Sequence, residues 1–397
     1  MKVLFLMFVF YDMNKSFNMY TSLVEEFKKN GHDVHIVAPD TDGSPTGIKI
    51  EKGFEILRVK TLPIKNVNNY IKGISNLLLP YQYQRAIKKY YPEVKFDLIV
   101  VPTPPIALAD LATSLKKKHN AKVYLMLRDI FPQNAVDLGF MKPKSFLFRY
   151  FRLKEKKLYQ TADHIGCMSQ GNIDYIIKHN QEVDSGKLHL LENFQYVYSG
   201  FGSDYNILRQ KYGLENKYVI MFGGNMGKPQ QLENVLELAK RCMNYPDVVF
   251  LLLGAGVRMQ WLSKQIDELN ISNIKIQGKI SKKEYQDLLT VCDVGLISLH
   301  EDFTVPNIPS KSLDYWNVGL PILASVDRGT DYTKVLDSTQ SGLWSFAGDH
   351  VSFEKNFDLL YHDAKLRKKL GNNGQKYHHA ELTPEIAYQK LMAKLKL

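Results

Sequence analysis

Short apolar runs rich in β-branched residues and leucine alternate with longer amphipathic stretches along most of the chain. In the first half, the runs that predict strands are Val3–Phe10, Val34–Ala38, Glu55–Val59, Leu98–Val101, Val123–Leu127 and His164–Met168. In the second half they are Val219–Phe222, Val248–Leu253, Ile274–Gln277, Val294–Leu299, Ile322–Ala324 and Leu343–Phe346. The stretches that predict helices include Asn18–Asn30, Ile106–His119, Leu232–Met243, Met259–Leu269, Lys282–Val291 and Ser310–Val318. Strands that are apolar on both faces and separated by helices predict parallel sheets covered on both sides, and the alternation occurs twice. We therefore expect an α/β fold with two doubly wound, Rossmann-like domains.

The periodicity lapses near Glu192–Asn206, where Tyr, Gly and Ser are frequent. This break predicts a first domain over residues 1–195 and a second over residues 196–379. A helix at about residues 380–397, with Pro384–Leu395 as its pattern, is expected to cross back to the first domain. In open α/β sheets, ligands bind outside the carboxyl ends of the strands. Two such domains facing across a cleft would place the site residues directly after the strands.

The apolar run that starts at Val3 resembles a signal peptide. No small-residue cleavage site follows it, and it is too short to span a bilayer, which takes about 20 residues. The run is therefore predicted to be a buried first strand. No other stretch of the sequence is long enough to cross a membrane.

Composition fits a globular protein and narrows its partners. The chain has 397 residues, 45% of them apolar and 23% charged, which excludes a disordered, collagen-like or disulfide-stapled chain. The formal net charge of +11 points to a phosphate-bearing partner: nucleic acid, a nucleotide or a lipid headgroup. Cys167, Cys242 and Cys292 are far apart and lack metal-type neighbours, which favours buried thiols in a reducing cytosol.

Two glycine-rich turns follow predicted strands in the second half. Phe222-Gly-Gly-Asn-Met-Gly-Lys-Pro229 lies between a strand and a helix, where glycines let the backbone approach a ligand and the helix offers N–H groups to an anion. A tight strand-to-helix turn explains the same residues. For Leu253-Gly-Ala-Gly256 an ordinary turn is the simpler interpretation.

The segment Val305–Ala324 carries the most specific signal. Pro309 and Ser310 predict a helix start, because serine caps helices and proline is tolerated in the first turn. Lys311 then lies where the helix dipole disfavours a cation, which is explained if an anion docks beside it. Asp314 follows one turn later on the same face and could accept two hydrogen bonds from ribose hydroxyls. The alternative is a capped helix with a solvated Lys–Asp pair.

Charged residues also follow a strand in the first half, in the segment Arg128–Gly139. Arg128 and Asp129 come directly after the predicted strand Val123–Leu127, which places them at the mouth of the cleft. A structural ion pair between the two side chains is the alternative interpretation.

The segment Met141–Tyr159 is strongly basic and interleaved with aromatic residues. It contains seven Lys and Arg residues and one acidic residue, and the upstream segment Tyr70–Tyr91 is also rich in Leu, Tyr and basic residues. Basic amphipathic helices with aromatic residues suit an anionic membrane surface, although a helix packed on its own domain by those aromatics fits as well. No helix-turn-helix, RRM or zinc-finger pattern is present, so nucleic acid is not expected as a partner.

Together these segments resemble the GT-B-fold retaining glycosyltransferases of family 4. The chain is most similar to the branch that assembles bacterial O-antigen and capsule repeat units, including the N-acetylfucosaminyl transferases. The resemblance covers nearly the whole chain. The segments that carry it are Asn30–Val34, Arg128–Gly139, Gly223–Gly227, Gly254–Gly256 and Pro309–Ser325.

The resemblance implies a role for each candidate residue. The catalytic candidates are Asp129, which would meet donor sugar and acceptor, Lys311, which would bind the donor diphosphate, and Asp314, which would hold the ribose hydroxyls. The remaining donor-binding candidates are Gly224, Asn225, Lys228, Gly254, Gly256, Lys279, Ile280, Asn307, Pro309 and Ser310. Of these, Lys279 and Ile280 belong to the loop that would contact the nucleotide base of the donor. Arg128 and Asn18 are the candidates on the acceptor side.

The sequence also departs from the family pattern. Pro306 occupies the position of the first of two family glutamates, and the second is shortened to Asp314. Asn225 and Gln230 lie near the positions of the customary cations for the diphosphate, which leaves Lys228 or Lys311 to supply the charge. Tyr11–Asn18 replaces the amino-terminal Gly-Gly loop.

The resemblance therefore implies transfer of a sugar, expected to be an N-acetylated amino sugar, from a UDP-sugar to a glycan on a polyprenyl diphosphate, with retained anomeric configuration. Neither a cofactor nor a metal site is expected. The enzyme is expected to be cytoplasmic and peripheral on the inner face of the cell membrane. The alternatives are a GT-B-fold UDP-sugar epimerase and a non-catalytic subunit that binds nucleotide sugars as a scaffold.

Overall fold

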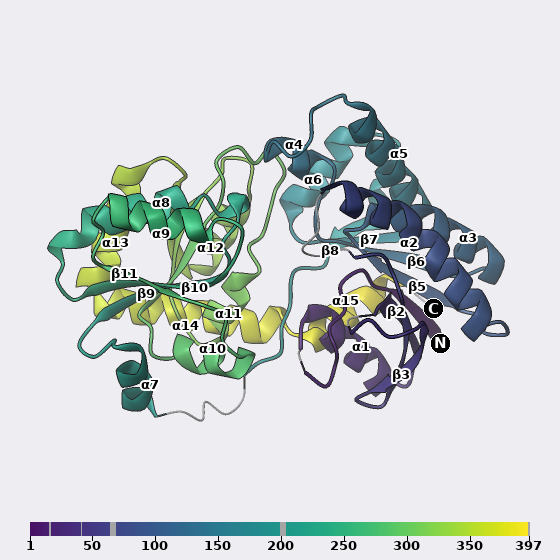
Figure 1. The fold of residues 1–397 in the computed structure, drawn as a ribbon, viewed down its shortest axis with the longest axis horizontal. Coiled ribbons are helices and arrows are strands. Elements are labelled where there is room, and N and C mark those ends of the chain that lie inside the picture. The colour runs from purple at the N-terminus through teal and green to yellow at the C-terminus, as the bar shows by residue number, and fades with distance from the viewer. Residues whose placement is uncertain (16, 41, 64–68, 199–203, 396–397) are drawn as a thin grey trace. The chain divides into compact units, whose positions relative to one another are not determined.

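The computed structural model describes the chain except for residues 16, 41, 64–68, 199–203 and 396–397. The chain divides into two compact units, one formed by Met1–Gln195 with Pro384–Leu397 and the other by Tyr196–Thr383. Residues 199–203, which are part of the predicted break, lie outside the described residues. In each unit, helices cover a central sheet (Figure 1).

The first unit is built on an eight-stranded sheet in the order β3-β4-β2-β1-β5-β6-β7-β8. Its strands are β1 (Lys2–Leu6), β2 (Asp33–Pro39), β3 (Gly47–Glu51), β4 (Phe54–Val59), β5 (Leu98–Pro102), β6 (Lys122–Leu127), β7 (His164–Cys167) and β8 (Leu188–Leu190). Its helices are α1 (Met19–Lys29), α2 (Asn69–Tyr90), α3 (Ala109–His119), α4 (Gln133–Asp137), α5 (Phe146–Thr161), α6 (Gln170–His179) and α15 (Pro384–Leu395), with short 3₁₀ turns η1 (Ile106–Leu108) and η2 (Ser185–Lys187). Neighbouring strands are parallel except for the edge hairpin β3–β4.

The second unit is built on a six-stranded parallel sheet in the order β11-β10-β9-β12-β13-β14. Its strands are β9 (Tyr218–Asn225), β10 (Val248–Ala255), β11 (Ile274–Gln277), β12 (Val294–Ser298), β13 (Ile322–Val326) and β14 (Gly342–Phe346). Its helices are α7 (Tyr205–Tyr212), α8 (Leu232–Arg241), α9 (Met259–Glu268), α10 (Lys282–Leu289), α11 (Lys311–Asn317), α12 (Tyr332–Thr339), α13 (His350–His362) and α14 (Ala364–Glu381), with 3₁₀ turns η3 (Lys228–Gln230) and η4 (Cys242–Asn244).

Both faces of the second sheet are covered by apolar side chains. Met221 and Leu251 belong to one buried cluster, whereas their neighbours Phe222 and Leu252 belong to another. Because successive residues of a strand point to opposite faces, apolar residues at every position require cover on both sides. This confirms the predicted doubly wound α/β architecture.

Helix α15 packs in the first unit although it follows the second unit in sequence. Its Tyr388 ring contacts the Phe27 ring of α1 edge-on at 5.0 Å, and the Tyr388 hydroxyl lies 2.7 Å from His32 Nε2. Leu391 belongs to the buried cluster that includes Val3 of β1. In Figure 1 this yellow helix lies beside the purple α1.

The observed elements differ from the predicted ones mainly at strand ends. Strand β1 stops at Leu6, four residues before the predicted end, although Met7 N still donates to Val37 O of β2 at 2.8 Å. Strands β9 and β10 instead continue through the glycine-rich segments and pair as far as Asn225 and Ala255. The first glycines of each segment are thus paired strand residues, whereas Gly227 and Gly256 lie in the expected turns, where their carbonyls accept from Gln230 N and Met259 N. Strands β3 and β8 and helices α4, α6, α7, α12, α13 and α14 had no predicted counterpart.

Candidate functional site

The site residues of the second unit gather where the strand order reverses. From β9 the chain builds outward to β10 and β11, then returns to place β12 on the other side of β9. The connections leave the carboxyl ends of β9 and β12 in opposite directions, and in parallel sheets such a switch point is where ligands bind. Gly224 is the second-last residue of β9 in this region, and Lys311 begins the helix that follows β12.

Lys311 is held by neutral groups on its own unit. Its Nζ donates a hydrogen bond to Gln230 Oε1 and lies 3.8 Å from the centroid of the Phe222 ring. Removal from water lowers the pKa of the Lys311 ammonium to about 7, although the nearby Asp314 carboxylate acts in the opposite direction. Because a bound anion would favour the charged form, this arrangement suits a phosphate-bearing ligand.

Asp314 is engaged by a residue that sequence reasoning did not select. The hydroxyl of Tyr198 donates a hydrogen bond to Asp314 Oδ1. The backbone of the same segment is fixed by Asn317, whose Oδ1 accepts from Tyr198 N at 2.9 Å and whose Nδ2 donates to Tyr196 O at 2.7 Å. The Tyr-rich composition of this segment was the only signal in the sequence, and it marked a domain boundary.

The predicted helix start is correct, but its cap is not. Helix α11 begins at Lys311, and Ser310 precedes it with a helical backbone (φ −63°, ψ −21°). A capping serine normally has an extended backbone that turns its hydroxyl toward the first N–H groups. The exposed side chain of Ser310 makes no such bond, so the prediction that it caps the helix was wrong.

The glycines of the two strand ends fall into two kinds. A Cβ on Gly254 would lie 1.9 Å from Gly224 O, and one on Gly256 would lie 2.2 Å from Met226 O. Close backbone packing alone therefore explains why these two positions are glycine, whether or not a ligand binds there. Gly224 is exposed with a φ of +122°, and a Cβ there would approach Lys311 Cε at 3.8 Å, so it borders the lysine. Asn225 is exposed at the end of β9.

The other donor-side candidates lie in loops around this edge. Lys228 is half-buried at the start of η3, the turn that also carries Gln230. Asn307 is tied through its carbonyl to Thr330 Oγ1 at 2.7 Å, and Pro309 is buried just before α11. Lys279 is exposed in the loop between β11 and α10.

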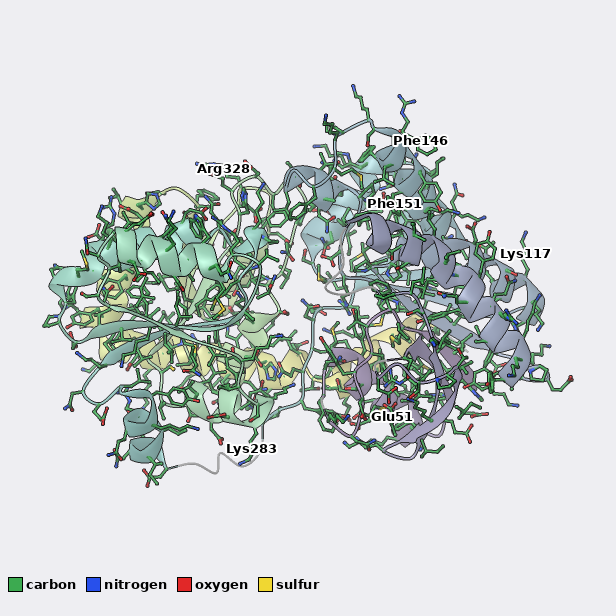
Figure 2. All side chains as sticks on the ribbon, viewed as in Figure 1. Glu51, Lys117, Phe146, Phe151, Lys283 and Arg328 are labelled. Carbon is green, nitrogen blue, oxygen red and sulfur yellow. The ribbon has the colours of Figure 1, made fainter. Side chains whose placement is uncertain are left out.

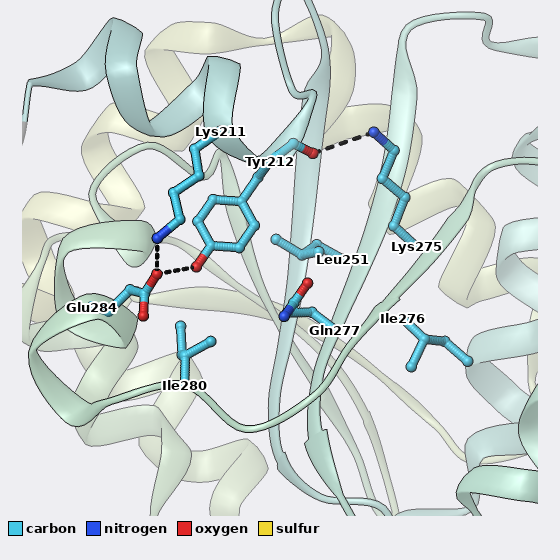
Figure 3. Close-up of a pocket in the computed structure, with 8 residues that line it drawn as sticks. All are labelled: Lys211, Tyr212, Leu251, Lys275, Ile276, Gln277, Ile280 and Glu284. Carbon is cyan, nitrogen blue, oxygen red and sulfur yellow. Dashed lines mark hydrogen bonds and ion pairs between the residues drawn. The ribbon is translucent and has the colours of Figure 1, made fainter.

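Ile280 lines a pocket of about 560 Å³ that sequence reasoning did not predict (Figure 3). The pocket is formed by Lys211, Tyr212, Leu251, Lys275, Ile276, Gln277, Ile280 and Glu284. Its polar wall is Glu284, which pairs with Lys211 and accepts a hydrogen bond of 2.7 Å from the Tyr212 hydroxyl. Lys279, the other candidate in this loop, does not line the pocket.

In the first unit, Arg128 and Asp129 follow β6 at the carboxyl edge of the sheet. Arg128 is 6% exposed, and its Nη1 donates to Leu191 O at 2.6 Å while its Nε and Nη2 are buried without a partner. No ion pair joins it to Asp129, both residues being among those described, so the ion-pair alternative was wrong. Asp129 has an exposed side chain, yet the surrounding protein desolvates its carboxyl and raises its pKa to about 6.

Asn18, the other acceptor-side candidate, is the N-cap of α1. Its Oδ1 accepts from Tyr20 N at 2.8 Å and Thr21 N at 3.0 Å, and Thr21 Oγ1 accepts from Asn18 N at 2.8 Å. This capping box accounts for an asparagine at this position. In the parts of the chain that are described, no group of three or more His, Cys, Asp and Glu side chains is arranged to hold a metal ion.

Comparisons with known proteins agree with this architecture. The profile of "Glycosyltransferase Family 4" matches residues 18–194, and that of "Glycosyl transferases group 1" matches residues 204–377. The probable glycosyltransferase WbjE of Pseudomonas aeruginosa is 25% identical over 75% of this chain and 74% of its own length. The putative colanic acid biosynthesis glycosyl transferase WcaI of Escherichia coli is 29% identical over 64% of each chain.

A solved structure shows the same fold at low sequence identity. The structure of HepE from Anabaena in complex with UDP matches with a TM-score of 0.72 at 14% identity and covers 100% of both chains. The two matched profiles together take in both units, and the fold is shared over the full length. The chain is therefore a GT-B glycosyltransferase of the group 1 and family 4 type.

Proposed function

We propose that this protein transfers a sugar, an N-acetylated amino sugar, from a UDP-sugar to a glycan carried on a polyprenyl diphosphate in bacterial surface polysaccharide biosynthesis. The observation that carries the proposal is the placement of the Lys311 side chain beside the exposed Gly224 at the switch point, with Asp314 one turn further along α11. A cation and a carboxylate at this spacing match two parts of a nucleoside diphosphate, the anionic diphosphate and the neutral ribose diol, whose hydroxyls can donate hydrogen bonds to a carboxylate. The name of WcaI and the UDP in the HepE structure are consistent with this assignment.

In the proposed reaction the acceptor hydroxyl oxygen forms a bond to the anomeric carbon while the bond from that carbon to the β-phosphate oxygen breaks. The hydroxyl proton passes to the departing phosphate, so UDP leaves and the configuration is retained. Lys311 stabilises the negative charge that develops on the leaving diphosphate, which is the kind of fixed electrostatic contact that lowers a barrier. Asp129 is the candidate on the first unit for contact with the sugar and the acceptor. Neither a cofactor nor a metal ion has a role in this proposal.

The decisive experiment incubates purified protein with a panel of UDP-sugars, with and without a polyprenyl-diphosphate-linked acceptor. Release of UDP only with acceptor supports the transferase. Conversion of the donor to an isomer without acceptor would instead identify an epimerase, and binding without turnover would identify a scaffold. Proton NMR of the product reports whether the anomeric configuration is retained.

The acceptor class also implies a membrane partner, and the first unit has a surface suited to one. Phe146, the first residue of α5, is 86% exposed, Leu147 after it is exposed too, and Phe140 in the preceding loop is 67% exposed. Figure 2 labels Phe146 together with Phe151, which is buried on the same helix. On α2, Ile74, Leu77, Leu78 and Tyr81 are exposed as well. A groove of about 480 Å³ between α2, α3 and α5 is lined by Leu77, Leu78, Tyr81 and Tyr150, among others.

The charges of α5 refine this part of the proposal. Arg152 pairs with Glu155, Lys156 with Glu182, and Lys154 and Lys157 with Asp110. These cations are largely neutralised by the protein itself. We therefore place the contact with anionic lipid at residues 140–149, where the exposed cations are Lys142, Lys144 and Arg149 and no acidic residue occurs. We propose in addition that the protein is peripheral on the inner face of the cell membrane. No helix in the described part of the chain is long and apolar enough to span a bilayer.

A further inference from the structure

We infer that Tyr198 occupies, in the ligand-free protein, the place that a ribose hydroxyl takes on Asp314, so that the donor must displace its side chain to bind. This inference rests on the proposed function, because it takes Asp314 as the carboxylate that holds the ribose. It adds a residue to the donor site that no sequence pattern selected, and it assigns that residue a role in how tightly nucleotide is held.

The contact is between the same kinds of groups that a nucleotide would bring. The Tyr198 hydroxyl donates a hydrogen bond to Asp314 Oδ1, and each hydroxyl of a ribose diol would donate to a carboxylate oxygen in the same way. Two oxygen atoms cannot take one position at hydrogen-bond distance from Oδ1. In this inference the ribose hydroxyl that engages Oδ1 uses the acceptor site that Tyr198 now fills, so the two hydroxyls compete for Asp314.

The backbone of the segment is anchored independently of that hydroxyl. Asn317, which is 2% exposed, binds Tyr198 N and Tyr196 O through its side-chain amide, and its own carbonyl accepts from Gln375 Nε2 at 3.1 Å. These bonds can persist when the Tyr198 side chain turns away from Asp314. The tyrosine therefore stays within reach, and it can return to the carboxylate when nucleotide leaves.

The consequence for the reaction is weaker retention of the nucleotide product. The diol contributes to affinity only the difference between its own hydrogen bonds to Asp314 and the one that Tyr198 gives up. When the product leaves, the Tyr198 hydroxyl can restore its hydrogen bond to Asp314 Oδ1, which offsets part of the loss of the ribose hydroxyls. Tyr198 thus favours release of UDP after transfer.

The test is a calorimetric comparison of two proteins with two ligands. We expect the variant Tyr198→Phe, which keeps the ring but loses the hydroxyl, to bind UDP about tenfold more tightly than the unaltered protein, because a hydrogen bond to a charged acceptor no longer has to be broken. With 2′,3′-dideoxy-UDP, which lacks both ribose hydroxyls, the two proteins should bind equally. The expected gain in affinity therefore depends on the ribose diol. A merely structural role of Tyr198 would not produce that dependence.

A matched control is Tyr245→Phe, which removes another tyrosine–aspartate hydrogen bond of the same unit, 2.9 Å long, to Asp358. It should bind UDP as the unaltered protein does. Unchanged or weaker UDP binding by Tyr198→Phe would overturn the inference while leaving the proposed donor site intact. If neither protein binds UDP, GDP or ADP, both the inference and the proposed function are wrong.

Discussion

The Lys311 ammonium lies 3.8 Å from the centroid of the Phe222 ring and donates its hydrogen bond to the neutral amide oxygen of Gln230. A ring face and an amide attract a cation without neutralising it. The charge of Lys311 is thus positioned by groups that leave it available to an anion. A diphosphate that enters this crevice supplies the full negative charge that neither Phe222 nor Gln230 provides.

The first prediction concerns catalysis by this lysine. The variant Lys311→Ala should reduce kcat by about 10²-fold, the scale of losing one strong contact to charge that develops in the transition state. The measurement is UDP release in the presence of acceptor. Lys264→Ala is the control, since Lys264 lies on α9 with 71% of its side chain exposed, and it should retain full activity. A folded Lys311→Ala protein with unchanged turnover would remove Lys311 from the diphosphate site.

The second prediction concerns pH. The pKa of Lys311 is about 7 in the ligand-free protein, and a bound diphosphate raises it by favouring the ammonium. Below pH 7 the lysine is already charged, so UDP affinity should not vary on its account. Above pH 7 binding must take up a proton, so the association constant should fall by up to about tenfold per pH unit.

Calorimetry between pH 6 and 9, in buffers of different ionisation enthalpy, measures both the affinity and the proton uptake. Lys311→Arg serves as the comparison, because a guanidinium stays charged throughout this range. It should abolish the slope above pH 7. If the slope persists in that variant, another group is responsible for it.

The third prediction concerns stability. Arg58 is 1% exposed and binds Glu51 through Nε and Nη2, at 2.8 Å and 2.7 Å, while Glu51 also accepts from Met13 N. Arg58→Met leaves a buried carboxylate without its cation, so the free energy of unfolding should fall by about 3–5 kcal/mol. Urea denaturation measures this change.

The surface pair Lys264–Glu268, with side chains 71% and 50% exposed, is the control for that experiment. Lys264→Met should change the free energy of unfolding by less than about 1 kcal/mol. An equally small effect of Arg58→Met would mean that the buried pair contributes no more than an exposed one.

The fourth prediction concerns the membrane surface. Reversing the charges of Lys142, Lys144 and Arg149 should release the protein from vesicles that contain anionic lipid, as measured by flotation at moderate salt. Reversing Arg152 and Lys156 should have a smaller effect, because both are already paired with Glu155 and Glu182. The opposite ranking would place the contact along the helix rather than at its start.

The sequence predicted the parts of the site that depend on local pattern. The helix start at Lys311, the spacing to Asp314 and the glycines at the ends of β9 and β10 could all be read from neighbouring residues. The bond from Tyr198 to Asp314 could not, because it joins residues 116 positions apart. The neutralisation of Lys154 and Lys157 by Asp110 of α3 likewise depends on how helices pack. A charged pattern on one helix does not reveal which acids a neighbouring helix brings to it.

Helix α15 has a consequence for how the protein is made. It contributes Tyr388 and Leu391 to the core of the first unit, yet the ribosome adds it only after Tyr196–Thr383 has been synthesised. The first unit therefore cannot complete its core while its own residues 1–195 leave the ribosome. The second unit, in contrast, has been synthesised in full before α15 is added. Although it is translated first, the amino-terminal unit cannot reach its final packing before α15 has been synthesised.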